Sequence, residues 1–117
     1  MKILFILAFL LFSCTVKAAS EEEILDLTNF YTSTGGSNWT TNTNWLNGGD
    51  PCDFNAIWFG VHCTLDGNVS AILLQQNNIV GSIPPLDHLT SLSSFVLPNN
   101  QITNIPQFST TAPLSTM

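Results

Sequence analysis

The chain has 117 residues, with eight Asp and Glu against two Lys and Arg, and a formal charge of −6 at pH 7. Both basic residues, Lys2 and Lys17, lie near the N-terminus, so the rest of the sequence is acidic. This charge argues against binding to nucleic acid phosphates or to anionic lipid head groups. The length suits one small domain.

The N-terminus has the pattern of a secretory signal peptide. Ten apolar residues, Ile3 to Phe12, follow Lys2 and precede small residues, and this run is shorter than the roughly 20 residues that a membrane-spanning helix needs. Val16-Lys17-Ala18 predicts cleavage after Ala18, which leaves 99 residues with a formal charge of −8. We therefore predict a secreted, extracellular protein, and no later segment of the sequence is long and apolar enough to cross a bilayer.

A second interpretation of this segment stays open. Leu11-Phe12-Ser13-Cys14 resembles a bacterial lipobox, in which Cys14 becomes the lipid-modified first residue and anchors the protein to a membrane. Phe12 fits that pattern poorly. Either route leaves Cys52 and Cys63 as one pair, which can form a disulfide in an oxidising compartment. Closing that loop is worth roughly 3 kcal/mol.

The first predicted element after the signal is a helix. Ser20-Glu21-Glu22-Glu23 is a capping box, in which the serine accepts from a first-turn amide and the last glutamate reaches back. Acidic residues also suit the positive end of the helix dipole. Gly35-Gly36 is predicted to end the helix. The apolar stripe between these signals consists of Ile24, Leu27, Phe30 and Tyr31.

An irregular segment rich in Asn, Thr and Gly holds Trp39, Trp45 and Trp58. Their large rings can cover the exposed end of a solenoid, and aromatic stacking with a ligand is the second interpretation. Asn38-Trp39-Thr40 and Asn68-Val69-Ser70 are glycosylation sequons. Asn38 and Asn68 are therefore candidate glycan acceptors if the chain enters a eukaryotic secretory pathway.

The segment that begins at Val69 nearly repeats itself, as leucine-rich repeats do. Apolar and Asn positions recur 23 residues later, an Ile-Pro-apolar pattern recurs 22 residues later, and a third copy starts at Leu114. The first copy has Val69, Ile72, Leu74, Asn77, Ile79, Ile83, Pro84 and Leu86, and the second has Leu92, Phe95, Leu97, Asn100, Ile102, Ile105, Pro106 and Phe108.

Each copy begins with a predicted strand whose alternate residues point inward. Ile72 and Leu74 point inward in the first copy, so the residues between them must point outward. The side-chain amides of Asn77 and Asn100 are predicted to bond backbone groups of neighbouring segments that would otherwise lack partners.

These motifs together match a known family. Over about residues 21–108, the chain resembles plant-type leucine-rich-repeat proteins. This family includes receptor-like-kinase ectodomains and inhibitors of polygalacturonases. The resemblance implies an extracellular recognition module that binds on its strand-lined face. The motifs that carry it are Asn38-Trp39, Trp45-Leu46, Pro51-Cys52, Trp58-Phe59-Gly60-Val61-His62-Cys63 and Asn77-Asn-Ile-Val-Gly-Ser-Ile-Pro84.

We therefore predict an α/β fold: a short right-handed leucine-rich-repeat solenoid with a helical, disulfide-bonded N-terminal cap. Residues 1–18 are the predicted signal peptide, 19–68 the cap, and 69–117 two repeats and the start of a third. One coil cannot bury enough apolar surface to fold alone. The sequence shows no C-terminal cap, so a partner or further repeats are expected to cover that end. The alternative is a shortened N-terminal piece of a longer receptor with little function alone.

The outward side chains of the two predicted strands form the candidate ligand-binding face. Leu73 and Val96 make an apolar spot rimmed by amides, although the β-propensity of aliphatic residues also explains their presence. The face consists of Ala71, Leu73, Gln75, Gln76, Ser94, Val96, Pro98 and Asn99.

No motif in the sequence points to catalysis or to a metal. The spacing of His62 and His88 from the aspartates fits no short zinc or calcium motif. No Ser-His-acid arrangement stands out, and two coils provide no deep cleft for paired carboxylates. We predict no enzymatic activity, cofactor or metal, and a receptor-like module whose ligand is an extracellular protein or glycan.

Overall fold

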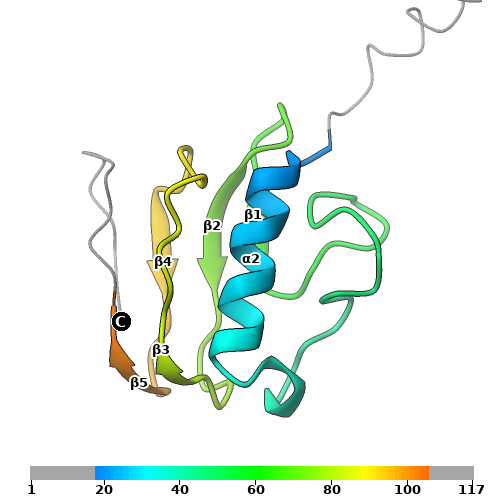
Figure 1. Ribbon diagram of the computed structural model, residues 1–117. Coiled ribbons are helices and arrows are strands. Elements are labelled where there is room, and N and C mark those ends of the chain that lie inside the picture. The colour runs from blue at the N-terminus through cyan, green and yellow to red at the C-terminus, as the bar shows by residue number, and fades with distance from the viewer. Residues whose placement is uncertain (1–17, 106–117) are drawn as a thin grey trace, which may run out of the picture.

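The structure, a computed structural model, describes residues 18–105. The predictions on residues 1–17, including Cys14, on Pro106 and Phe108 of the second copy, and on the third copy at Leu114 lie outside the described residues. Among residues 18–105, no helix is long and apolar enough to cross a membrane. The elements in chain order are helix α2 (Glu21–Ser33), the 3-10 helix η1 (Gly36–Asn38) and strands β1 (Val61–Cys63), β2 (Val69–Leu73), β3 (Val80–Ser82), β4 (Ser94–Val96) and β5 (Gln101–Asn104) (Figure 1).

Helix α2 begins where the capping box predicts. The Ser20 hydroxyl accepts from the Glu23 backbone N–H at 3.1 Å, and the Glu23 carboxylate accepts from the Ser20 N–H at 3.4 Å. The other carboxylate oxygen of Glu23 accepts from the Val69 N–H at 3.0 Å. This buried side chain therefore joins the start of the helix to the first residue of β2.

The strands form two separate sheets. In the first, β2 pairs antiparallel with β1 and parallel with β4, and in the second β3 and β5 pair in parallel. Figure 1 shows β4 on the other side of β2 from β1, and Glu23 bonds α2 to the start of β2. The partners in β2 and β4, such as Ala71 and Ser94, are 23 residues apart, which is the spacing of the two copies in the sequence. The internal repeat thus sets the register of this parallel pair.

The prediction of a leucine-rich-repeat solenoid is wrong. The described residues form a small compact α/β unit with one α-helix and short strands in a mixed sheet and a parallel pair, and they form no solenoid. A solenoid extends by stacking similar coils, each adding a parallel strand. Here the first sheet has one parallel pairing and one antiparallel pairing, because β1 and β2 form a hairpin.

Aromatic rings fill the core between the helix and the first sheet. Phe30 of α2 contacts the rings of Trp39, Trp45 and Phe95 at centroid distances of 5.4, 6.1 and 5.9 Å, and Trp45 contacts Trp58 at 5.0 Å. The three tryptophans are at most 5% exposed, so they are core residues and do not offer open rings for ligand stacking. The contact between Phe30 and Phe95 packs the helix against β4.

Two asparagine side chains replace missing strand neighbours, as the sequence predicts. The amide oxygen of Asn100 accepts from the N–H groups of Asn77 at 2.8 Å and Ile79 at 3.0 Å, and its nitrogen donates to the Leu74 carbonyl at 2.8 Å. Asn77 does the same one segment earlier, bonding the backbone N–H and carbonyl of Thr41 at 2.7 and 2.9 Å. Three successive segments are therefore connected through two amides.

Replacing Asn100 by Ala should lower the free energy of unfolding by roughly 2–4 kcal/mol, because two backbone N–H groups and three backbone carbonyls lose a hydrogen bond. Denaturant unfolding followed by tryptophan fluorescence measures the change. The control is Asn29→Ala at an exposed position of α2, where we expect a change within about 0.5 kcal/mol. Equal effects of the two substitutions would contradict the role of Asn100.

Candidate functional site

The two faces of the first sheet differ in burial. In and just after β2, Ile72 and Leu74 are fully buried, whereas Leu73 between them is 40% exposed. In β4, Phe95 is buried and its two neighbours are half-buried. Side chains alternate between the faces of a strand, so one face packs on the core and the other is open.

The register of β2 and β4 brings the central residues of the predicted face together. Ala71 pairs with Ser94, and Leu73 pairs with Val96. Side chains in register on adjacent strands lie close together on one face. Leu73 and Val96 therefore form one apolar pair on the open face.

The other four predicted residues continue these two segments past the strands. The Gln76 N–H donates to the Pro98 carbonyl at 2.9 Å, so the segments stay adjacent. Gln76 and Asn99 both have a positive φ, 51° and 61°, and such backbone turns the chain away from the strand direction. Gln75, Gln76 and Asn99 are exposed. The strip, as we call the eight predicted residues from Ala71 to Asn99, thus has an apolar pair followed by polar groups.

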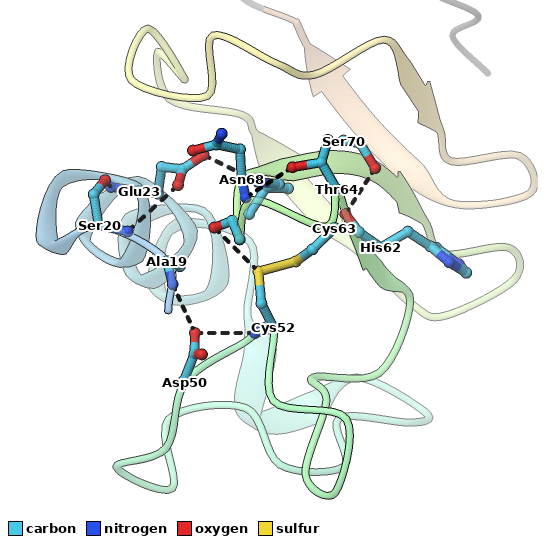
Figure 2. Close-up of a disulfide and its surroundings, with 12 residues drawn as sticks. Ala19, Ser20, Glu23, Asp50, Cys52, His62, Cys63, Thr64, Asn68 and Ser70 are labelled. Atoms are coloured by element: carbon cyan, nitrogen blue, oxygen red, sulfur yellow. Dashed lines mark hydrogen bonds between the residues drawn. A yellow bond between two sulfur atoms is a disulfide. The ribbon is translucent and has the colours of Figure 1, made fainter. Parts of the chain in front are cut away.

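Strand β1 adds a feature that the sequence reasoning missed. His62 pairs with Ala71 and is exposed, and its side chain extends away from the disulfide in Figure 2. Beside it lies a hollow of about 190 Å³, which we call the disulfide hollow. The available signal was large apolar residues placed among polar ones in two loops. The disulfide hollow is lined by Cys52, Phe54, Ile57, His62, Cys63, Thr64 and Leu65.

The predicted disulfide between Cys52 and Cys63 is present, with the two Cα atoms 5.7 Å apart (Figure 2). It joins the irregular segment after Asp50 to the end of β1. The Asp50 carboxylate supports the same place, because it accepts from the N–H groups of Cys52 and Ala19, both at 3.1 Å. The disulfide therefore joins the two loops that line the disulfide hollow.

The remaining predicted site types concern glycans and metals. Asn38 and Asn68 are exposed, and their glycosylation stays a prediction. Within residues 18–105, no three His, Cys, Asp or Glu side chains gather in a way that could hold a metal ion.

An ion pair that the sequence reasoning missed connects α2 to the segment before β4. The buried Asp26 accepts from the His88 backbone N–H at 2.8 Å, and its other oxygen lies 3.1 Å from the His88 Nδ1. The hydrogen bond to Asp26, together with its charge, raises the pKa of His88 above the ordinary 6.5. The two residues are 62 positions apart, and no local pattern connects them.

Comparison with known proteins does not identify a function. No protein family model, curated protein or solved structure matches the chain. The resemblance to plant-type leucine-rich-repeat proteins therefore stays a prediction.

The stabilisation that the Asp26–His88 pair provides should decrease as the pH rises. Since the folded pKa of His88 is raised, this contribution is fully present below the unfolded value, about 6.5, and is lost as the pH rises through the folded pKa. Asp26→Asn should lower the His88 pKa, measured by NMR titration, and remove this part of the pH dependence of unfolding. An unchanged His88 titration in Asp26→Asn would contradict the pairing.

Proposed function

We propose that this chain is a secreted or cell-surface binding module that recognises another extracellular molecule through the open face of the sheet β1-β2-β4. The observation that supports this most is the register that places Leu73 beside Val96 on that face. Leu73 is 40% exposed although both of its neighbours in the chain, Ile72 and Leu74, are fully buried. Exposed apolar groups that gather on one face are a common mark of interaction sites.

The surroundings of the apolar pair favour specific recognition. Protein interfaces commonly have an apolar centre and a polar rim that supplies hydrogen bonds. Gln75, Gln76 and Asn99 supply exposed amide and backbone groups at one end of the strip. At the β1 edge, His62 and the disulfide hollow extend the apolar surface.

The charge of the chain restricts the kind of partner. Residues 18–105 include all eight acidic side chains and no Lys or Arg. A complementary partner surface is therefore neutral or basic. The apolar pair favours a protein as the ligand, while the amides of the rim also suit the hydroxyl groups of a glycan.

The extracellular location is part of the proposal. The Cys52–Cys63 disulfide is compatible with it, because such bonds persist in oxidising compartments. The apolar run Ile3 to Phe12 supports export as well.

The double substitution Leu73→Glu and Val96→Glu should weaken binding to the partner by about tenfold or more, because it places two charges in the apolar centre. Folding should be little affected, since these side chains point away from the core. Binding is measured by quantitative mass spectrometry of extracellular proteins and glycans retained by the wild-type and variant proteins.

The matched control is Leu25→Glu, which adds a charge at an exposed leucine of α2. It should retain the same molecules as the wild type. If the folded double variant retains every one of them as well, recognition does not use this face.

A further inference from the structure

A second hollow, of about 300 Å³, lies between helix α2 and the turn around residues 46–49. Its volume is at the lower end of the range for small-molecule sites, about 300–1,000 Å³. It shares no lining residue with the strip or the disulfide hollow. We call it the Trp58 hollow, and it is lined by Ile24, Thr28, Leu46, Gly48, Gly49 and Trp58.

Trp58 is one of the residues that line this hollow, and its indole Nε1–H is buried without a hydrogen-bond partner. The corresponding Nε1–H groups of Trp39 and Trp45 donate to backbone carbonyls at 3.1 and 2.9 Å. The Trp58 side chain is 2% exposed, and its Nε1 is the buried side-chain nitrogen or oxygen in residues 18–105 that has no hydrogen-bond partner. Such groups are rare, because burial removes their bond to water without replacing it.

The other walls are apolar or already hydrogen-bonded. Ile24 and Leu46 contribute aliphatic side chains, and the Thr28 hydroxyl donates to the Ile24 carbonyl at 2.8 Å. A Cβ atom added at Gly48 or Gly49 would meet no atom within 4 Å, so this side of the hollow is open. The lining includes no Asp, Glu or His, which favours an uncharged ligand.

We propose that the Trp58 hollow binds a small neutral molecule with an apolar body and one hydrogen-bond acceptor, such as a ketone or ester carbonyl. The apolar body packs against Ile24 and Leu46. The Trp58 Nε1–H, which is buried in the structure, donates to the acceptor after a small shift of the indole toward the hollow. This site is independent of the open face of the sheet.

The three indole N–H groups allow a direct test by NMR. Titration of ¹⁵N-labelled protein with cyclohexanone should shift the Trp58 indole N–H signal downfield until it saturates. Methylcyclohexane has a similar shape and no acceptor, so it should not cause that downfield shift. The signals of Trp39 and Trp45 are internal controls, because their N–H groups are already bonded to the backbone.

Two variants test whether the ligand binds in the Trp58 hollow. Gly49→Leu adds a side chain to the wall and should raise the Kd for cyclohexanone by about tenfold, while Gln75→Ala on the strip should leave it unchanged. If Gly49→Leu loses the native indole spectrum, Leu46→Ala tests the same wall. The proposal is overturned if no saturable shift occurs, if all three indoles shift alike, or if the ketone and the hydrocarbon act alike.

A separate observation concerns the bond where the signal peptide is predicted to end. Ala18 is exposed, while Ala19 is buried and its backbone nitrogen lies 3.1 Å from the Asp50 carboxylate (Figure 2). Ser20 then begins the helix as its N-cap. Cleavage after Ala18 would therefore form the new amino group directly beside a carboxylate.

We infer that processing after Ala18 converts this amide contact into an ion pair between the Ala19 α-ammonium and Asp50. Hydrolysis adds one water across the Ala18–Ala19 bond, and the leader leaves with the new carboxylate while Ala19 keeps a protonated amine. A charged donor makes a stronger hydrogen bond than the amide that it replaces. The N-terminus is then held against Cys52, which bonds the same carboxylate oxygen. This inference depends on the predicted cleavage and not on ligand binding.

The groups around the new terminus have opposite effects on the positive charge of its α-amino group. Glu21, Glu22 and Glu23 in the first turn of α2 favour a positive charge there. The positive end of the helix dipole opposes it. Asp50 is the group in direct contact, so it is the one to test.

Intact mass of the secreted protein should show a chain that begins at Ala19. The α-amino pKa of this protein, measured from the pH dependence of acylation, should be higher than in Asp50→Asn, which keeps the acceptor oxygen and loses the charge. The stabilisation is then present below about pH 8 and is lost as the pH rises through the raised pKa. In a control protein that keeps Ala18, Asp50→Asn should change the α-amino pKa by less than it does in the protein that begins at Ala19. A different mature N-terminus, or equal α-amino pKa values, would overturn the inference.

Discussion

Backbone polar groups that are taken out of water need hydrogen-bond partners, and this constraint shapes most of the protein. The strands contain three to five residues each, so many backbone groups have no strand neighbour. Side chains take the place of the missing neighbours: Glu23 bonds the Val69 N–H, and Asn77 and Asn100 bond the segments next to them. These contacts fix the inner side of the first sheet together with the aromatic core.

Because the inner side supplies stability, the outer face is available for recognition. Leu73 and Val96 belong to strands whose positions are set by Ile72, Leu74 and Phe95, which are buried. The disulfide fixes the loop after Asp50 to the end of β1 by a covalent bond. The two hollows differ in kind: one lies beside His62 of β1, and the other is lined by Trp58, whose buried indole N–H is unpaired.

Local signals in the sequence predicted local structure well. The capping box at Ser20 starts the helix, the alternation at Ile72 and Leu74 gives the buried side of β2, and the 23-residue spacing gives the register with β4. The prediction of a solenoid was wrong because the repeat determines only how two similar segments pair. It does not determine which strands form the edges of the sheet. The contacts of Asp50 with Ala19 and of Asp26 with His88 join residues 31 and 62 positions apart, so no local pattern could reveal them.

Native-state amide hydrogen exchange tests most directly whether side-chain acceptors hold the backbone of this fold in place. The N–H groups of Val69, Asn77 and Ile79 donate to side chains. They should exchange only through global unfolding, with the same opening free energy as the Leu74 N–H, which bonds the Val96 carbonyl between strands. Exchange of these three groups as fast as in an exposed turn would show that the side chains do not hold the backbone in place.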